Sequence, residues 1–364
     1  MKTEILNKRF LFFVLQLILF TLLILAAIMW INSSLDAAHV ISSKTHEEMA
    51  KIALGGETVA VPENYNERIY QLSILDHISS MPETIVIGSS RGMYLGKETT
   101  GFESIYNHCV SGACLEDYYA MVGLYRQKYG KTPPRVIMEL SPWIFYSGNP
   151  EARWVESFTY RNAAQKLYAA LNGKELKVEV DMEDPWLSLP YFQYNYRTLR
   201  RYGPEIFDSY PAHASTDPDE PADRPDGTIR YAASKENESP ERLALVRSIS
   251  GPVTYQYVQH MTEIDPGKRS AFENLVREML SKGTEVVFYL SPFSVTQCSY
   301  SYDEGLNPAF PMVEDYLYDF AAQCGAKVVG AYEPQNYGLT DERFLDDEHL
   351  DKQGTAIVWA AAYK

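Results

Sequence analysis

The sequence predicts an α/β protein in which helices cover both faces of a five-stranded parallel sheet, behind one membrane-spanning helix. Short apolar runs alternate with helical patterns along two separate stretches of the chain. This alternation is typical of a three-layer α/β/α arrangement whose strands are buried on both faces. A polar insertion separates the two stretches, and an uncharged segment near the N-terminus predicts the membrane helix.

The uncharged segment is the first element, and it covers residues 10–31. Basic residues occur within the first nine positions, and none follows the segment until Lys44. This bias predicts that residues 1–9 are cytoplasmic and that the bulk of the chain is extracytoplasmic, on a single-pass plasma-membrane anchor. A cleaved signal peptide is the alternative, with a weak cleavage signal at 36–38. Its apolar region would be shorter, roughly 7–15 residues, so we expect an uncleaved anchor.

The first α/β stretch follows a stalk and a leading helix, which together we expect at residues 32–80. Apolar residues recur at helical spacing from Ile69 to Ile78, which predicts the leading helix. The stretch itself covers 81–146. Its predicted strands are Thr84–Gly88, Ser104–Asn107 and Arg135–Leu140, and its helix is Leu115–Tyr129, ended by Gly130.

The insertion covers residues 147–250 and breaks the α/β rhythm. Its Pro- and Asp-rich run at 215–227 predicts a loop. The segment 191–202 mixes aromatic residues with arginines, which suits binding of sugars or anionic polymers. The alternative, which we favour, is an amphipathic helix that packs its aromatic residues on the main domain.

The second α/β stretch covers residues 251–364. It predicts a helix at Ala271–Lys282, a strand at Glu285–Leu290, a helix at Pro311–Cys324, a strand at Lys327–Val329 and a helix after Gly354. With the first stretch this gives five strands, and therefore one sheet built from two distant parts of the chain.

Polar residues follow each predicted strand directly. They are Ser90, Gly112, Ser141, Ser291 and the pair Asp346 and His349. Ligands of open parallel sheets bind beyond the carboxyl ends of the strands. We therefore expect these residues to meet in one site.

Three of these residues predict a serine nucleophile with its base. A serine hydroxyl reacts only when a base removes its proton, and His349 has a pKa near neutrality. Asp346 lies three residues before His349, where its carboxylate can orient the ring. Ser89 is the competing nucleophile, but Ser90 better matches the turn after the strand. A helix after Ser90 is expected to direct its first N–H groups at the oxyanion.

The motifs resemble those of the SGNH/GDSL hydrolase superfamily, within it the membrane-anchored bacterial branch that includes the teichoic-acid D-alanylation protein and polysaccharide O-acetyltransferases. Gly88-Ser89-Ser90 is similar to the first block, and Asn107 to Gly112 is similar to the second. Asp346 and His349 match the last block. The resemblance implies a flavodoxin-like sheet, Ser90 as nucleophile, and the N–H of Gly112 in the oxyanion hole.

The third block of that family departs from the pattern. The family has Gly-x-Asn-Asp there, whereas this chain has Glu139 to Trp143. We expect the Ser141 hydroxyl to take the place of the missing asparagine in the oxyanion hole. Arg91 either orients an anionic substrate or is a solvated helix residue, and we count it with Trp143 and Asn107 as candidates for substrate binding.

The resulting functional prediction is an anchored serine esterase or O-acyltransferase that acts on a cell-envelope polysaccharide or a teichoic-acid-like polymer. A membrane-bound acyltransferase is a candidate partner. The alternative is a catalytically weak or inactive accessory protein of the same fold. No cofactor and no metal are expected; the adjacent carboxylates at 346–348 offer a cation site as the weaker alternative.

Composition argues against nucleic acid as a partner and leaves open whether the cysteines form a disulfide. The net charge is −15, with no basic stripe, so nucleic acid is not an expected partner. The four cysteines are not spaced as a zinc site, and an extracytoplasmic location permits disulfides. One bridge and free buried thiols both remain open, and spacing cannot choose the pairing. They are Cys109, Cys114, Cys298 and Cys324.

Overall fold

A five-stranded parallel sheet, in the order β3-β2-β4-β7-β8, forms the centre of the described chain in this computed structural model. Its strands are β2 (Thr84–Ile87), β3 (Ile105–Asn107), β4 (Arg135–Glu139), β7 (Glu285–Leu290) and β8 (Lys327–Gly330). The structure describes residues 2–36, 41–42, 44–62, 65–178, 185–203, 212–239, 241–242, 258, 260–303, 305 and 308–363. The predicted fold class, including the strand positions, is confirmed.

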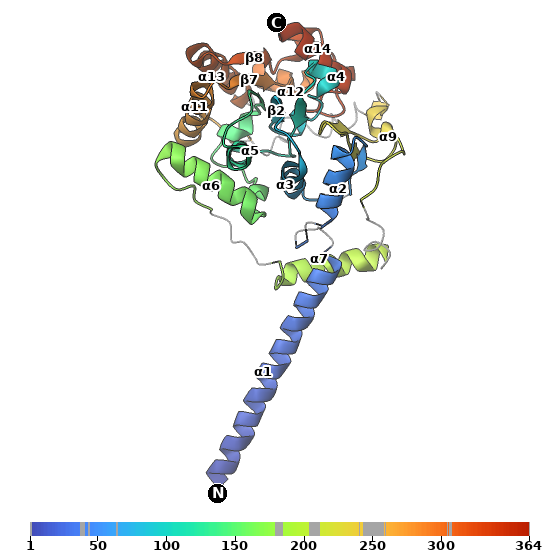
Figure 1. Cartoon of the computed structure of the whole chain (residues 1–364), viewed down its shortest axis with the longest axis vertical. Coiled ribbons are helices and arrows are strands. Elements are labelled where there is room, and N and C mark those ends of the chain that lie inside the picture. Colours follow the sequence, from blue (N-terminus) through green and yellow to red (C-terminus); the bar gives the residue numbers. More distant parts are fainter. Residues whose placement is uncertain are drawn as a thin grey trace.

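The sheet is covered on both faces because alternate strand residues point to opposite sides. Ile85 and Met138 belong to the core shared with α5 (Leu115–Tyr129), α11 (Pro266–Ser281) and α13 (Ala309–Cys324). The intervening Val86 and Ile137 pack on the other side, where the core includes residues of α14 (Lys352–Ala362). Figure 1 shows these helices around the sheet.

The helix ends follow local sequence signals. Asp265 accepts a hydrogen bond from the Lys268 N–H and caps α11, which starts at Pro266 rather than at the predicted Ala271. Gly130 ends α5 in the left-handed conformation, as its position after the helix predicted. The other helical elements are α2 (Lys44–Leu54), α3 (Glu67–His77), α4 (Lys97–Thr100), α6 (Phe158–Asn172), α7 (Leu189–Tyr202), α9 (Ala233–Glu236), α12 (Val295–Cys298), and the short turns η1 (Ser90–Gly92), η2 (Pro142–Phe145), η3 (Arg153–Val155), η4 (Ser299–Asp303), η5 (Pro334–Tyr337) and η6 (Asp341–Arg343).

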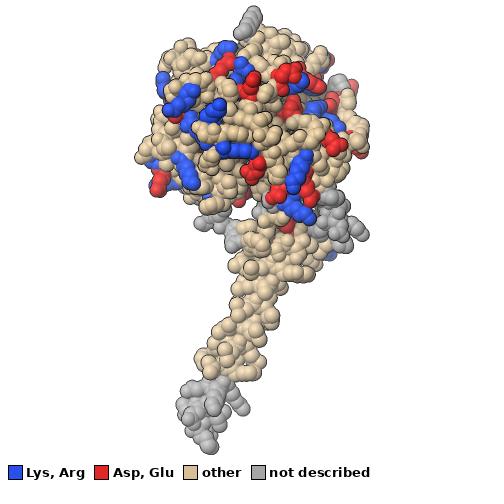
Figure 2. All heavy atoms as spheres, viewed as in Figure 1, with Lys and Arg blue, Asp and Glu red and all other residues tan. Residues whose placement is uncertain are grey.

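The N-terminal helix α1 (Lys2–Leu35) projects away from the rest of the molecule (Figure 1). Its segment Phe10–Leu35 is long and apolar enough to cross a membrane, and none of its most apolar window is buried in the protein. Figure 2 shows this segment without a charged side chain, whereas Lys, Arg, Asp and Glu are interspersed over the domain.

The region expected to be a stalk is largely part of the domain. Helix α2 packs on α3, and its Met49 and Ala53 are fully buried with Tyr70. Strand β1 (Val59–Ala60) then pairs with the insertion. Burial of α2 and pairing of β1 leave little of 44–62 to act as a free spacer.

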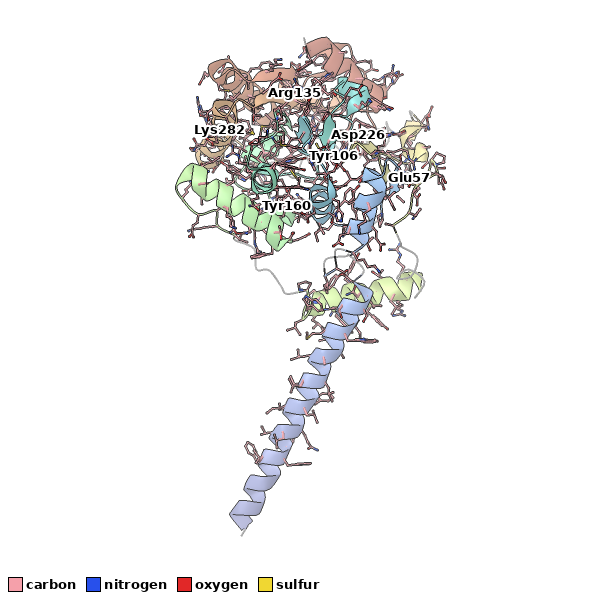
Figure 3. All side chains as sticks on the ribbon, viewed as in Figure 1. Glu57, Tyr106, Arg135, Tyr160, Asp226 and Lys282 are labelled. Carbon is pink, nitrogen blue, oxygen red and sulfur yellow. The ribbon has the colours of Figure 1, made fainter. Side chains whose placement is uncertain are left out.

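The described parts of the insertion pack on the domain through a helix and a small sheet. Helix α6 packs on α5, and its Tyr160 is part of the main core. A small antiparallel sheet combines β1 with β5 (Ala222–Asp223) and β6 (Ile229–Arg230), and of these β5 lies inside the run 215–227 predicted as loop. The turn of this hairpin docks on β3, where the Asn107 N–H donates to the Asp226 carbonyl at 2.8 Å, beside Tyr106 (Figure 3).

Candidate active site

The turn after β2 is tightly packed because two glycines let the backbone approach Glu139. Gly88 has a φ of +149°, and a Cβ there would lie 2.6 Å from the Glu139 Cβ. A Cβ on Gly92 would lie 2.8 Å from the Cys109 sulfur. Between them the chain forms only the short turn η1, so no long helix follows Ser90. The expectation that such a helix directs N–H groups at an oxyanion is therefore wrong.

The turn places Ser90 against the C-terminal loop. The Ser90 Oγ lies 2.7 Å from His349 Nε2, although the two residues are 259 positions apart. The His349 Nδ1 lies 2.8 and 2.9 Å from the two carboxylate oxygens of Asp346. Hydroxyl, imidazole and carboxylate thus form one continuous chain at the carboxyl end of the sheet.

The charges of the site favour a basic imidazole. Burial of the His349 ring lowers its pKa, but the charge and hydrogen bond of Asp346 outweigh burial and hold the pKa above its usual 6.5. Burial raises the pKa of the Asp346 carboxyl, but His349 and the Glu348 N–H outweigh this and hold that pKa well below 3.8. Near neutral pH Asp346 is therefore a carboxylate that stabilises a positive charge on His349.

The two serines of the turn have different surroundings. Ser89 is fully buried, and its Oγ accepts a hydrogen bond from the Arg91 N–H at 3.3 Å. Ser90 is half-buried and is the serine that contacts His349. The geometry therefore favours Ser90 over Ser89 as the reactive hydroxyl.

Arg91 is buried beneath the Ser90 turn, with 3 % of its surface exposed. Its Nε donates to the Glu348 carbonyl at 3.2 Å, and another guanidinium nitrogen donates to the Ser291 carbonyl. The guanidinium also lies over the Phe293 ring, 3.4 Å from the ring centroid. An enclosed side chain of this kind is not solvated and does not contact an anionic substrate. Both predictions made for Arg91 are therefore wrong.

Arg91 and Glu139 form a buried ion pair that also involves Ser141. Nη1 of Arg91 lies 4.0 Å from Oε1 of Glu139 and donates to the Ser141 Oγ at 3.1 Å. The Glu139 carboxylate accepts from the Ser89 N–H at 2.7 Å and from the Ser141 hydroxyl at 2.6 Å. We call Arg91, Glu139 and Ser141 the buried cluster.

The buried cluster corrects the role expected of Ser141. A hydroxyl has one proton, and that of Ser141 goes to Glu139. The residue is also fully buried. Ser141 is therefore not placed to donate to an oxyanion, and Glu139, which the sequence reading left without a role, fixes the backbone of the turn.

Gly112 lies in a loop that starts beside the Ser90 turn, since the Val110 N–H donates to the Gly88 carbonyl at 2.9 Å. Its φ is +61°, and a Cβ would lie 2.7 Å from a guanidinium nitrogen of Arg153, so the position requires glycine. Within the described part of the chain, no hydrogen bond engages the Gly112 N–H.

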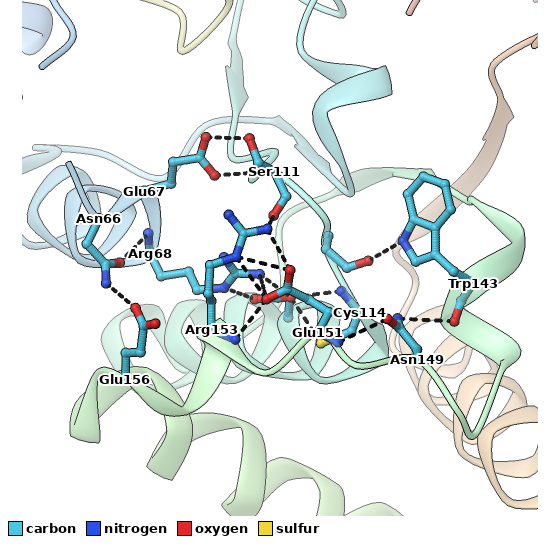
Figure 4. A network of polar contacts seen from close by, with 12 residues as sticks. Asn66, Glu67, Arg68, Ser111, Cys114, Trp143, Asn149, Glu151, Arg153 and Glu156 are labelled. Atoms are coloured by element: carbon cyan, nitrogen blue, oxygen red, sulfur yellow. Dashed lines mark hydrogen bonds and ion pairs between the residues drawn. The ribbon is translucent and has the colours of Figure 1, made fainter. Parts of the chain in front are cut away.

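A polar network braces the Gly112 loop (Figure 4). The Ser111 hydroxyl donates to Glu67 at 2.7 Å, and the Ser111 carbonyl accepts from Arg153 at 2.8 Å. The Arg68–Asp117 ion pair, at 2.7 Å and almost fully buried, lies below it. The network is built from α3, α5 and η3, so the backbone around Gly112 is held by several elements.

Two other candidates for substrate binding are structural. Trp143 is 3 % exposed, and its ring N–H donates to the Ala113 carbonyl at 2.9 Å. Asn107 is fully buried, and its amide donates to the carbonyls of Gly92 and Leu95 at 2.8 and 3.0 Å. Both side chains are committed to protein partners, which corrects the expectation that they touch substrate.

Two residues of the insertion form a wall of the site that the sequence did not indicate. The ammonium of Lys235 lies 4.0 Å from an Asp346 oxygen and 4.2 Å from the Tyr231 ring centroid. Tyr231 packs on Tyr94, which follows η1. No sequence signal indicated them, because β6 and α9 carry no motif and are brought to the site by tertiary contacts such as the Tyr94 hydroxyl with Glu236, at 2.7 Å.

The described residues contain neither a cluster of metal-ligating side chains nor a disulfide. No group of three or more His, Cys, Asp or Glu side chains among the described residues is arranged to hold a metal ion. All four cysteines are free thiols, and Cys324 alone among them is half-buried rather than buried. Burial raises the pKa of the Cys109 and Cys114 thiols, so both stay protonated and inert.

No protein-family model matches this chain, and a search of curated proteins finds no significant match. A function assigned to the chain therefore has to come from the chemistry of its own residues.

Proposed function

We propose that this protein is a membrane-anchored serine esterase or O-acyltransferase of SGNH type. The observation that carries the proposal is the contact of Ser90 Oγ with His349 Nε2, backed by Asp346 on the far nitrogen. Residues from opposite ends of the domain meet in the order that acyl transfer to a serine needs. The resemblance of the Ser90 and His349 motifs to SGNH enzymes agrees with this assignment.

The chemistry starts with proton transfer from Ser90 to His349. As Oγ attacks the carbonyl carbon of an ester, Nε2 takes the hydroxyl proton, and Asp346 stabilises the imidazolium. The tetrahedral intermediate collapses to an acyl-serine, and His349 returns the proton to the departing alcohol. Water or a glycan hydroxyl then attacks the acyl-serine, with His349 again as base.

The oxyanion of this intermediate needs N–H donors, because Ser141 is committed to Glu139. We assign that role to the backbone N–H groups of Ser90 and Gly112. Loss of one donor costs a typical acyl-transfer enzyme about 10²–10³ in rate. An oxyanion hole of two N–H groups, without an asparagine side chain, suits a slow or selective enzyme. Such an enzyme would use an activated acyl donor or a favoured acceptor.

The proposed location is the outer face of the plasma membrane, with α1 as an uncleaved anchor. The end of α1 is part of the folded structure, because Asn32 donates to the Ser188 carbonyl at 3.0 Å and Asp36 accepts from the Tyr191 hydroxyl at 2.6 Å. Cleavage near 36–38 would remove both contacts. An enzyme held there meets cell-envelope polymers and membrane-bound acyl-transfer proteins, which we propose as substrate and partner.

The proposal is tested with the purified full-length chain in detergent. We expect hydrolysis of p-nitrophenyl acetate that disappears in both Ser90→Ala and His349→Ala. Ser89→Ala is the matched control, because it removes the neighbouring hydroxyl and should keep the activity. Turnover that survives Ser90→Ala would overturn the assignment.

A second candidate is a non-enzymatic accessory protein of an envelope acylation system. The observation that favours it is the Ser141 hydroxyl, which donates to Glu139 rather than toward the site. This reading predicts no turnover of any acyl ester, together with binding of an acylated glycan that Ser90→Ala leaves intact. The esterase reading predicts turnover, so one assay separates the two.

A further inference from the structure

Helix α7 lies across the end of α1 that is nearest the domain (Figure 1). The two helices are in direct contact. If α1 crosses a bilayer, a helix that lies across its outer end is at the level of the membrane surface. The segment 191–202 is part of a helix, as the favoured interpretation expected, but in the described structure this helix packs on α1 rather than on the main domain.

Polar contacts of Asn32 fix this junction. Asn32 is fully buried and donates to the carbonyls of Pro185 and Ser188 at 2.8 and 3.0 Å. Its own side-chain oxygen accepts from the Asn195 amide at 3.2 Å. The carbonyls at the start of α7 and one of its side chains are thus tied to a single residue of α1, which holds the two helices at a defined angle.

One side of α7 carries an apolar stripe. Its residues recur at intervals of three and four and therefore share a helix face. They are Leu189, Phe192, Tyr196 and Leu199, and Trp186 lies in the turn three positions before Leu189. Trp186, Leu189 and Tyr196 are 43, 52 and 53 % exposed, so the stripe is largely uncovered. By helical geometry it adjoins the face of Asn195, which contacts α1, and it lies away from Arg197 and Arg201.

The depth of this junction matches the edge of a bilayer. The hydrocarbon core is about 30 Å thick, which about 20 helical residues cross. Counted from Phe10, the core ends near Trp30, a residue type that favours the membrane interface. Asn32 follows two positions later, about 3 Å farther along the helix. The start of α7 is therefore at the level of the lipid headgroups.

We propose that α7 and the preceding Trp186 form an interfacial helix that lies in the outer surface of the membrane. The apolar stripe enters the boundary between headgroups and acyl chains, and the arginines of the opposite side face the phosphates and water. This inference rests on the proposed anchoring by α1, and it adds a second attachment. Two attachments fix the height and tilt of the domain, and with them the distance of Ser90 from the membrane.

The test uses tryptophan emission of the full-length chain in nanodiscs of phosphatidylcholine and phosphatidylglycerol. Bromine on the acyl chains quenches a tryptophan that contacts them. A Trp30→Phe background removes the tryptophan of the span, and the other three, Trp143, Trp154 and Trp359, are buried in the domain. We expect brominated lipid to quench part of the emission, and Trp186→Phe to abolish that part. Quenching that is equal with and without Trp186, or absent from both, would overturn the proposal.

A matched pair of charge variants keeps the test independent of Trp186 itself. Leu189→Glu places a carboxylate in the apolar stripe and should reduce the quenching severalfold. Pro190→Glu places the same charge one position on, off the stripe, and should leave it unchanged; equal effects would contradict the proposal. Flotation of the nanodiscs reports anchoring by α1 separately, and ester hydrolysis reports the active site separately.

Discussion

The site has a rim, where Ser90 meets His349, and an interior, which is the buried cluster. Two consecutive residues, Ser90 and Arg91, belong to these two different regions. Ser90 is half-buried and meets His349, whereas Arg91 is buried and meets Glu139 and the carbonyl of Glu348. The hydroxyl proposed to react needs access to substrate, and the buried cluster needs full enclosure by partners. One short turn therefore supplies both the proposed chemistry and its support.

Arg91 links the two regions directly. Its guanidinium reaches the segments that follow β4 and β7, and it holds the carbonyl of the residue before His349. The position of the imidazole relative to Ser90 therefore depends on Arg91, which acts as a positioning residue. Changes at the rim should affect rate alone, and changes in the buried cluster should affect stability first.

Ser90→Ala should have the largest effect on rate. Removal of the nucleophile of a comparable serine site lowers kcat about 10⁶-fold. The free energy of unfolding should change by less than about 1.5 kcal/mol, because one partly exposed hydrogen bond is lost. Ester turnover and urea denaturation of the same preparation measure the two quantities, and a large loss of stability would contradict the division between rim and interior.

Asp346→Asn should follow, with kcat lower by about 10⁴-fold, because the amide no longer stabilises the imidazolium and favours the wrong tautomer. Steady-state kinetics on an acyl ester measure this. An effect below tenfold would show that Asp346 does not orient His349 during the reaction.

Arg91→Met should cost about 3–5 kcal/mol of folding stability, because it leaves Glu139 charged and unpaired in the interior. The matched control is Arg277→Met, which removes an exposed ion pair with Glu273 and should cost less than about 1 kcal/mol. Urea denaturation compares the two. Adding Glu139→Gln to Arg91→Met should cost less than the sum of the single changes, and additive costs would contradict the buried pair.

The pH profile should show a limb set by His349. Only the neutral imidazole accepts the Ser90 proton, so kcat/KM should fall about tenfold per unit below the His349 pKa. That pKa lies above 6.5 because Asp346 favours the charged ring. In Asp346→Asn the limb should move to lower pH; a shift to higher pH, or none, would contradict the electrostatic role of Asp346.

Ser141→Ala should have the smallest effect on rate. It leaves hydrogen-bond partners of the buried cluster unsatisfied and should cost about 1–3 kcal/mol of stability. Since its hydroxyl proton goes to Glu139, kcat should fall by much less than the factor of about 10²–10³ that follows the loss of an oxyanion donor. A loss of kcat of that size in a fully folded preparation would show that the Ser141 hydroxyl donates to the oxyanion.

Local patterns predicted the sheet and the rim residues well. The strands are short apolar runs, and the structure has α5 with the predicted bounds, ended by Gly130. Ser90, Asp346 and His349 were found because each follows a strand, and the carboxyl ends of parallel strands lie at one edge. These features depend on nearby residues, which the sequence displays directly.

The buried cluster and the α1–α7 junction depend on distant partners and were missed. Arginine is rarely buried, so composition assigns Arg91 to the surface, and only the fold supplies its carbonyl partners. Likewise, Asn32 gives no sign in the sequence that it pairs with Asn195, 163 positions away. Strands of two residues, such as β1 and β5, are too short to show a period.

The most direct test of the central claim is to treat the full-length protein with a fluorophosphonate and locate the adduct by peptide mass spectrometry. A reactive serine next to a basic imidazole should carry the phosphonyl group on Ser90, and His349→Ala should abolish the labelling. An adduct on Ser89 or another serine, or labelling that does not depend on His349, would contradict the account.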